Sequence, residues 1–460
     1  MYAVLRGHPP GLRRWAAVAL ALLAAIALHG LIALGSRPGP LADLTHFKYW
    51  TRLVSVEGLH AAYSGEYPET YAIYPPVTLL AFRLAGALYQ QAVDPAFALE
   101  PALASHVLTV LLRLQVLLFH LLVGLAVLAI GCRAAPFATA YGGMLAYLFN
   151  PGVVFDVAQW GQPDPVFGLF VLLALAAAVA SGGGSRPARW GWASGAGLAL
   201  ALAALAKPQA WVFLPLVAAL VGRRGGLAGL GAAAAGAAVG GLAVALPFLL
   251  HGTLRELVGL PRAISSVMPV VTANAHNLWW ALSNGAARWY LDQEPLAGAL
   301  SYRLVALGLV ALFAGLALLR ALREPTLGVA YLAGAYTGFG FFMAMTQIHE
   351  NHMYIVFPLL AVAAVSVGRP AGQGERARLW ALYAILALTW CANMLLHDFD
   401  LAEPVVAPLL PGPLEEAQRL NALANVAVFA IWTAWLATDT VRAWLPLRPP
   451  QPSAQAWSER

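Results

Sequence analysis

The sequence predicts an all-α polytopic membrane protein with about 12 transmembrane helices and a long loop after the first of them. Of the 460 residues, 60% are hydrophobic and 10% are charged, whereas an ordinary soluble domain has roughly 25% charged residues. Apolar runs of about 15 to 25 residues recur along the whole chain, and that length allows a helix to cross a hydrocarbon layer of ~30 Å. These observations exclude a soluble globular protein.

The charges and the cysteines exclude further classes. The formal net charge is +6 and the pI is about 9.4, but the basic residues lie in short loops between apolar runs, where they set the orientation of a membrane protein. We therefore expect no nucleic-acid partner. The two cysteines, Cys132 and Cys391, are too few for a disulfide framework or a four-ligand metal site.

Twelve apolar runs are expected to cross the membrane. They lie at 15–35, 106–130, 134–149, 165–181, 190–206, 208–222, 225–250, 296–319, 327–345, 353–367, 379–396 and 420–444. A few are shorter than the ~17 residues that a crossing prefers, so one or two are alternatively half-spans. The first run exceeds the roughly 7 to 15 apolar residues of a signal peptide, so we interpret it as a retained span.

The loops between these runs alternate in charge. With the N-terminus in the cytoplasm, every inward loop is basic. These loops contain Arg133, Arg186, Arg189, Arg223, Arg224, Arg320, Arg323, Arg369, Arg376, Arg378, Arg442 and Arg448. The positive-inside bias and the number of spans thus predict one topology, with residues 1–14 and 445–460 in the cytoplasm and a single membrane domain over 15–444.

A long first external loop is expected over 36–105. It includes the moderately apolar stretch 74–91, which opens with Tyr74-Pro75-Pro76. If this stretch crossed the membrane, every later basic loop would face outward. We therefore interpret it as an interfacial or re-entrant part of the loop.

Polar residues cluster in four places on the expected outer face, and the first cluster follows the first span. At the helical spacing i, i+3, i+7 and i+14 stand Asp43, His46, Trp50 and Glu57. A stripe with a carboxylate, an imidazole and a ring suits removal of a hydroxyl proton by a general base, with the ring stacked on a sugar. The alternative is a surface amphipathic helix with Asp43 as its N-terminal charge.

Four tyrosines follow in the same external loop, namely Tyr63, Tyr67, Tyr71 and Tyr74. They either line a carbohydrate groove or form an interfacial aromatic belt. The sequence leaves both interpretations open.

The second cluster occupies a short loop between two apolar runs. It contains Asn150, Asp156, Gln159, Trp160, Gln162 and Asp164. Amide, carboxylate and indole groups together hold a polar ligand at a membrane face. Helix capping by Asn150 or Asp164 explains part of the pattern, but capping requires neither Trp160 nor both glutamines.

The third cluster lies between two spans with no linker and has the sequence Thr346-Gln347-Ile348-His349-Glu350-Asn351-His352. Two imidazoles, a carboxylate and two amides at that depth suit a phosphate or a sugar. A zinc site is not expected, because Glu350 is the one nearby side chain that could serve as a third ligand beside the two histidines.

The fourth cluster lies within 255–280 and includes Arg262, Asn277 and Trp279. Lys207 is expected on the same face, where it breaks the positive-inside pattern. This cation either holds an anionic head group or snorkels to the interface. Arg113, inside the second span, is a further intramembrane cation.

These motifs, in this order, resemble those of the GT-C glycosyltransferases. The shared residues are Asp43 with Trp50, Tyr74-Pro75-Pro76, Asn150-Pro151, Gln159 to Asp164, Lys207-Pro208, Asn277-Leu278-Trp279 and Gln347 to Glu350. The chain looks most like the bacterial relatives of the GPI mannosyltransferase that adds the second mannose. It is more distantly similar to the dolichyl-phosphate-glucose glucosyltransferases of asparagine-linked glycosylation. The resemblance covers about 40 to 360 of the numbering.

The resemblance implies a GT-C-like fold, a polyprenyl-phosphate sugar donor, an acceptor hydroxyl at the outer leaflet, and inversion in a single displacement. It implies that Asp43 is the general base. The implied candidates for binding the sugar or the acceptor are His46, Trp50, Tyr74, Asp156, Gln159, Trp160, Gln162, Asp164, Asn277 and Trp279. The candidates for the donor phosphate are Arg113, Lys207, Arg262, His349, Glu350 and His352.

Two positions depart from the family pattern. Asn351 stands where a basic residue is common, and His46 stands where relatives often carry a second acid. His352, Arg262 or Arg113 would then have to supply the missing positive charge beside the leaving phosphate.

The sequence therefore favours a membrane hexosyltransferase, with mannose as the preferred sugar and a lipid, a glycan or a protein as acceptor. The alternatives are a flippase or transporter of lipid-linked sugars, which would place polar residues at the bilayer midplane, and an inactive scaffold of the same fold. No cofactor or metal ligand is expected, and use of a divalent cation stays open. The scarcity of lysine and the abundance of alanine are typical of a GC-rich bacterium, which suggests an inner-membrane protein with an extracytoplasmic site.

Overall fold

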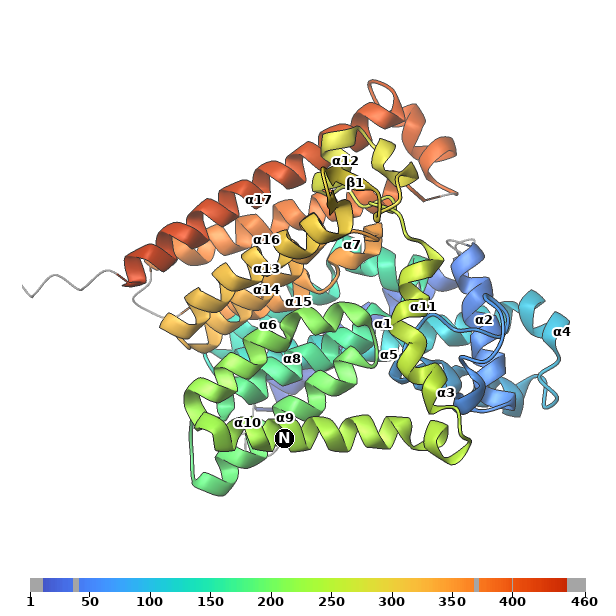
Figure 1. Ribbon diagram of the computed structural model, residues 1–460, viewed down its shortest axis with the longest axis horizontal. Coiled ribbons are helices and arrows are strands. Elements are labelled where there is room, and N and C mark those ends of the chain that lie inside the picture. The colour runs from blue at the N-terminus through green and yellow to red at the C-terminus, as the bar shows by residue number, and fades with distance from the viewer. Residues whose placement is uncertain (1–10, 36–40, 368–371, 399, 445–460) are drawn as a thin grey trace, which may run out of the picture.

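A computed structural model describes residues 11–35, 41–367, 372–398 and 400–444 of the chain. Most of this part is helical, and its one sheet is a hairpin of β1 (Pro295–Ala297) and β2 (Leu300–Ser301). A helix pairs its own backbone N–H and C=O groups, which is why helices suit a chain that lies in lipid. Figure 1 shows the resulting all-α architecture.

The helices differ widely in length along the chain. The α-helices are α1 (Leu12–Gly35), α2 (Leu41–Val56), α3 (Pro76–Ala92), α4 (Leu99–Ala104), α5 (His106–Gly131), α6 (Phe137–Leu148), α7 (Pro151–Val154), α8 (Asp164–Ala180), α9 (Arg186–Ala204), α10 (Leu214–Leu250), α11 (Leu254–Val267), α12 (Leu278–Ser283), α13 (Tyr302–Arg323), α14 (Leu327–Ala344), α15 (Val356–Ser366), α16 (Gly372–Leu395) and α17 (Leu414–Trp444). Short 3-10 and π turns are η2 (Leu59–Ala61), η3 (Phe155–Trp160), η4 (Pro208–Phe213), η5 (Ala286–Trp289), η6 (Glu350–Met353), η7 (Ala402–Val406) and η8 (Ala407–Leu409).

Seven of the described helical segments are long and apolar enough to span a membrane, and two shorter apolar ones lie at Asp164–Ala180 and Glu350–Ser366. One of the seven, Pro208–Leu250, contains two helices that meet at Gly226, where φ is 59° and ψ is −155°. Each of the twelve expected spans coincides with a helix or with one part of this segment.

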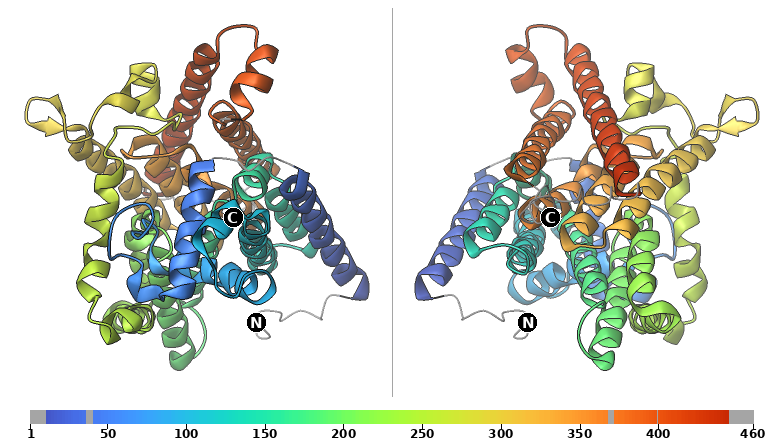
Figure 2. Two further views of the ribbon diagram at one scale, coloured as in Figure 1. Left: turned by 90° about the vertical axis from the view of Figure 1, so that its right-hand side faces the viewer. Right: turned by 90° about the vertical axis from the view of Figure 1, so that its left-hand side faces the viewer.

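The expected span at 296–319 begins too early. Residues 295–301 form the β1–β2 hairpin instead, which Figure 2 shows projecting from the helical body. The helix α13 starts only at Tyr302, because the Ser301 hydroxyl caps it by accepting a hydrogen bond from the Leu304 N–H at 3.3 Å. An N-terminal serine cap satisfies a helix donor that has no partner within the helix.

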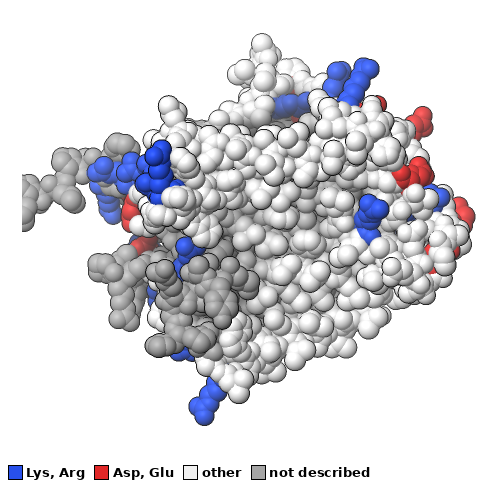
Figure 3. Space-filling view, turned by 90° about the horizontal axis from the view of Figure 1, so that it is seen from below, with Lys and Arg blue, Asp and Glu red and all other residues white. Residues whose placement is uncertain are grey.

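Charged side chains lie toward the two ends of the molecule. Figure 3 shows a broad belt between the ends that carries almost no charged residue. One end, which we call the acidic end, is formed by α2, α3 and α4; the other, the basic end, is formed by the turns at 181–186, 223–226 and 323–327 (Figure 1). This separation agrees with the positive-inside pattern of the sequence.

The interior of the belt is closely packed. Every residue of α15 is buried, and α14 is buried along its whole length apart from its first two residues and Phe341. The helices α9 and α10 approach closely at two glycines: a Cβ on Gly197 would meet the Ala233 carbonyl oxygen at 1.8 Å, and a Cβ on Gly236 would meet the Ser194 carbonyl oxygen at 1.9 Å. Small residues at such positions let helix backbones come together in a membrane.

A second, smaller core lies at the acidic end. It joins α2, α3 and the start of α5 to α11 through buried side chains such as Phe47, Trp50, Phe82 and Leu260. The helix α3 is also held to the segment before Lys207, because the Val77 N–H donates to Leu205 O and the Thr78 hydroxyl donates to Ala206 O, each at 2.8 Å. These contacts fix the elements that carry the polar clusters of this end.

Candidate active site

The candidate site lies at the acidic end, where segments far apart in the sequence meet. They are the first turn of α2, the loop 155–164 at the start of α8, the residue before η4, and the loop 346–352 before α15. Hydrogen bonds and ion pairs among their side chains define the geometry of the site.

Asp43, in the first turn of α2, is held by the second polar cluster. The Gln162 Nε2 donates to Asp43 Oδ2 at 2.7 Å, and the Tyr74 hydroxyl donates to Gln162 Oε1 at 3.3 Å. Gly161 makes this approach possible, because its left-handed backbone, with φ 68°, ends the preceding π-turn and turns the chain toward α2. Asp43 thus stands at a helix N-terminus, where a carboxylate is favoured, and one of its oxygens is fixed by an amide.

His46 and Trp50 lie on the same face of α2 as the helical spacing predicts. Their rings stack with centroids 5.9 Å apart, and the Tyr67 hydroxyl forms a hydrogen bond with His46 Nδ1 at 3.1 Å. Burial lowers the pKa of His46, although Asp43 and Glu69 act in the opposite direction. The imidazole is therefore neutral at neutral pH.

Trp50 and Glu57 occupy different settings from the rest of the stripe. Trp50 is 1% exposed and its indole N–H donates to the Pro68 carbonyl at 2.8 Å, so it packs the core beneath His46. Glu57 lies just beyond the end of α2 and is 3.7 Å from Arg52 in a surface ion pair. The first turns of the stripe thus carry the candidate site residues Asp43 and His46, whereas Trp50 packs in the core and Glu57 lies at the surface.

Lys207 forms a buried ion pair with Asp164. The Lys207 Nζ lies 2.6 Å from Asp164 Oδ1, and the Asn351 amide donates to Asp164 Oδ2 at 3.1 Å. A buried ion pair is stable when further hydrogen bonds satisfy the remaining oxygen atoms. The Lys207 ammonium group therefore lies inside the site and does not snorkel. Asn351, at the position where a basic residue is common in the family it resembles, hydrogen-bonds to the second oxygen of Asp164.

Asp156 is the least satisfied polar residue of the site. Its side chain is fully buried, and neither carboxyl oxygen has a hydrogen-bond partner among the described residues. Burial raises its pKa well above the usual value and Asp164 adds to the rise, whereas Lys207 opposes it. Asp156 lies in the π-turn η3, a backbone form that is frequent at functional sites.

The flanking residues of this loop hold it in place. The Trp160 indole N–H donates to Asp398 Oδ2 at 2.7 Å, which ties the loop to the segment after α16. The Arg113 guanidinium donates to the carbonyl of Gln159 at 2.6 Å and to that of Ala33 at 3.0 Å. Arg113 therefore joins α1, α5 and the loop, with two of its nitrogens occupied by backbone oxygens.

Asp292 holds the loop before α15 in place. This fully buried carboxylate forms a bidentate ion pair with Arg303, with both N···O distances 2.8 Å. It also accepts from the Thr346 hydroxyl at 3.0 Å and from the Gln347 amide at 2.9 Å. Gln347 has φ 61°, an uncommon backbone conformation for a residue with a side chain, and Asp292 holds it there.

His349, Glu350 and His352 follow directly. The His349 backbone N–H donates to His352 Nδ1 at 3.3 Å, and the two imidazole rings lie 5.4 Å apart. Burial lowers the pKa of His349; Asp43 raises it and Lys207 lowers it further, so these three groups share one electrostatic environment. The Trp390 indole N–H donates to the Glu350 carbonyl at 2.8 Å, while Glu350 Oε2 has no described partner.

Three predicted residues lie at the margin. Asn277 caps α12 by accepting from the Trp280 N–H at 3.1 Å, and Trp279 donates to the Ala344 carbonyl at 2.8 Å. Arg262 is exposed on α11. Asn277 thus stabilises the start of α12 and Trp279 ties α12 to the end of α14, whereas the structure does not bring Arg262 into the hydrogen-bonded cluster.

Sequence reasoning missed two supporting residues, namely Asp292 and Asp398. Each is a partner of a residue in a predicted cluster across a long sequence separation, and no local motif marks such a partner. Asp398 follows the expected span at 379–396, near Asp400 and Glu403, and this local acidity is the one sequence feature that pointed to it. Within the described residues, no three His, Cys, Asp or Glu side chains are grouped so as to hold a metal ion.

The overall arrangement of these helices matches that of known structures. The crystal structure of ArnT from Cupriavidus metallidurans bound to undecaprenyl phosphate is similar with a TM-score of 0.51 and 18% identity, over 92% of this chain and 77% of that one. The apo form of the same ArnT gives a TM-score of 0.50 with 17% identity over the same shares. The described residues thus share the overall fold of ArnT.

Further comparisons add a more distant structure and one sequence family. An Archaeoglobus fulgidus oligosaccharyltransferase tethered with an acceptor peptide gives a TM-score of 0.47 and 13% identity, over 93% of this chain and 55% of that one. Residues 306–354 match the family model described as a protein of unknown function, DUF2759. No curated protein matches the sequence.

Proposed function

We propose that this protein is a membrane glycosyltransferase that transfers a sugar from a polyprenyl-phosphate donor to an acceptor hydroxyl. The observation that carries the proposal is the cluster in which Asp43, Gln162, the Asp164–Lys207 pair and His349 come together at one end of a GT-C fold. The undecaprenyl phosphate bound to ArnT supports a donor or product of that lipid class. A hexose is the expected sugar, with mannose favoured.

Asp43 is the proposed general base. Its carboxylate accepts one hydrogen bond from Gln162, which orients it, and it lies in the first turn of α2. The acceptor hydroxyl gives its proton to Asp43 as its oxygen attacks the anomeric carbon. The bond from that carbon to the phosphate oxygen breaks, its electron pair leaves with polyprenyl phosphate, and the configuration inverts.

The leaving phosphate needs positive charge or hydrogen-bond donors. Lys207 is the buried ammonium group of the cluster, and Asp164 is its partner. Asp164 holds the Lys207 side chain in place before the donor binds. The neutral imidazoles of His349 and His352 then supply N–H donors without a permanent charge.

The localisation and the partners follow from the same proposal. The acidic end would face outward, with both termini in the cytoplasm of a bacterium, and the acceptor would be a lipid, a glycan or a protein of the cell envelope. Protein groups alone would carry out the displacement. Surrounding membrane lipids would hold the long polyprenyl chain.

The test is transfer from radiolabelled polyprenyl-phosphate mannose and polyprenyl-phosphate glucose to acceptors in membranes that contain the protein. Replacing Asp43 by Asn should lower transfer at least ~100-fold, because the acceptor loses its base. Glu100→Gln is the matched control, since Glu100 is an exposed carboxylate at the same end. Full activity of the Asp43→Asn variant would remove Asp43 from the base role.

A further inference from the structure

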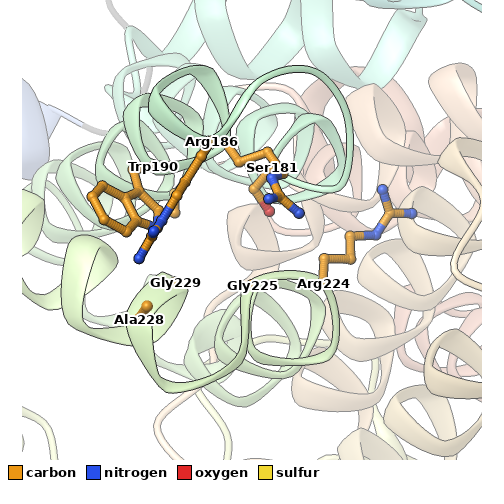
Figure 4. A pocket seen from close by; sticks show the side chains of 9 residues that line it. Ser181, Arg186, Trp190, Arg224, Gly225, Ala228 and Gly229 are labelled. Carbon is orange, nitrogen blue, oxygen red and sulfur yellow. The ribbon is translucent and has the colours of Figure 1, made fainter.

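A basic pocket lies at the end of the molecule opposite the candidate active site. It has a volume of about 240 Å³ and is formed by the turn between α8 and α9 and by the kink region of α10. The side chains that matter most to its chemistry are Ser181, Arg186, Arg189, Trp190 and Arg224. Figure 4 shows the pocket from close by.

Two of its arginines are available for a ligand. Among the described residues, the guanidinium groups of Arg186 and Arg189 form no ion pair and no hydrogen bond with another residue. Arg186 lies over the Trp190 ring, 4.6 Å from its centroid, which orients the side chain by a cation–π contact. The described part of the chain therefore leaves the positive charge of these two arginines without a neutralising acid.

The first turn of α9 adds further donors. Its N-cap residue, Ser185, makes no side-chain capping bond, so the N–H groups of Arg186 and Ala188 keep their hydrogen-bonding capacity. Pro187 has no N–H, and the Arg189 N–H donates to the Ser185 carbonyl at 3.0 Å. Arg186 and Arg189 stand in that first turn. A helix N-terminus with two arginines beside a pocket is suited to an anion.

Arg224 makes the wall of the pocket rigid. Its guanidinium donates to the carbonyls of Val179 and Pro325, and Figure 4 shows it directed away from Arg186 and Trp190. A Cβ on Gly182 would meet Arg224 Nη1 at 2.6 Å, so the α8–α9 turn fits around this arginine. The pocket thus has two available arginines on one side and a fixed helix junction on the other.

The depth of the pocket indicates the source of the anion. Trp190 and Trp192 are exposed on α9 next to it, and exposed tryptophans mark the level of lipid head groups. Basic pockets between membrane helices at that level bind the phosphate of anionic lipids. We propose that this pocket binds a phosphate-bearing anion, the head group of an anionic phospholipid such as phosphatidylglycerol.

The inference does not depend on the proposed glycosyl transfer, and its test measures binding. Purified protein in detergent is titrated with phosphatidylglycerol, with phosphatidylcholine and with inorganic phosphate, and adducts are counted by native mass spectrometry. We expect phosphatidylglycerol to bind at least ~10-fold more tightly than phosphatidylcholine. The double variant Arg186→Gln/Arg189→Gln should lose that preference.

A charge-matched control separates the pocket from the basic surface in general. Arg13→Gln/Arg442→Gln removes two exposed arginines from the same end and should keep the wild-type preference. If the glutamine variant fails to fold, Arg186→Lys/Arg189→Lys keeps the charge but removes the paired guanidinium donors, and should bind with intermediate affinity.

The outcomes are distinct. Binding of phosphatidylglycerol that depends on Arg186 and Arg189 supports a lipid site. If inorganic phosphate binds with the same dependence and the anionic lipid is not preferred, the pocket is instead a site for free phosphate. Equal binding by the wild type and the pocket variant would overturn the proposal. So would a loss of the preference that the Arg13→Gln/Arg442→Gln control shares.

Discussion

Asp156 shows how a single residue departs from ordinary protein chemistry at this site. A buried carboxyl group with two unpaired oxygens is destabilising, so its presence points to a functional role. From the sequence, Asp156 was one polar residue of a short loop, and its isolation could not be predicted, because burial and missing partners are properties of the assembled fold. The pairing of Asp164 with Lys207 was likewise hidden by their separation of 43 positions.

The first prediction concerns Asp156→Asn and the dependence of stability on pH. The folded protein holds a proton on Asp156 that the unfolded chain has already released, because burial raises the pKa above its usual 3.8. Stability therefore falls as the pH rises from 3.8 toward the raised pKa. An asparagine at this position does not titrate, so the variant does not lose stability in this way. Asp156→Asn should unfold about 1–3 °C higher than the wild type at about pH 8, and the gain should shrink toward about pH 5.

Thermal unfolding followed by tryptophan fluorescence in detergent tests this expectation, with Glu100→Gln as a control on the exposed surface. An Asn variant that is less stable at every pH would show that Asp156 has a charged partner in the folded protein. If Asp156 contacts the sugar or the acceptor, the same variant should also lose transfer activity.

The elements follow the apolar periodicity of the sequence closely, and their exceptions have physical causes. The expected spans at 208–222 and 225–250 correspond to two helices that meet at Gly226, whose backbone angles are not helical. The hairpin at 295–301 replaces the first turn and a half of an expected span. Apolarity alone does not distinguish such a short hairpin from a helix, because leucine and alanine occur in both.

The second prediction tests the close contact between α9 and α10. Gly236→Leu adds a Cβ only 1.9 Å from the position of the Ser194 carbonyl oxygen, so the two helices must separate. We expect a loss of about 3 kcal/mol or more in stability, since overpacking against a rigid backbone is costly. Unfolding temperature and yield of the monodisperse protein measure it.

Gly231→Leu is the matched control for that experiment. It lies on the same helix, and no atom lies within 4 Å of the position that its Cβ would take, so its leucine should face lipid at little cost. If Gly236→Leu and Gly231→Leu are equally stable, the close packing of α9 against α10 is not required by the fold.

The whole molecule combines a predictable frame with a site that is harder to predict. Composition and positive-inside bias predicted the all-α membrane architecture. Each spanning helix pairs its own backbone N–H and C=O groups, and its apolar residues and flanking charges can be read directly from the sequence. The site joins residues from segments that lie far apart in the sequence, from Asp43 to Asp398. The resemblance to known motifs predicted that most of them act together, but the supporting contacts of Asp292 and Asp398 required the folded chain.

The third prediction concerns the orientation of this frame. In a background with Cys132→Ser and Cys391→Ser, Glu66→Cys introduces a thiol at the acidic end and Arg223→Cys introduces one at the basic end; Glu66 is exposed, and Arg223 lies in the turn between the two halves of α10. A membrane-impermeant maleimide applied to intact cells should label the first variant and should label the second only after permeabilisation. The reverse pattern would place the candidate site in the cytoplasm.

The burial of both lysines has a consequence for chemical labelling. Lys48 is 9% exposed and donates to the Leu103 carbonyl, and Lys207 is 5% exposed and paired with Asp164; the sequence contains no other lysine. Amine-reactive reagents therefore find no side-chain amine on the surface of the folded protein. Acylation at Lys207 would record how often the site opens to water, and a bound donor should slow it.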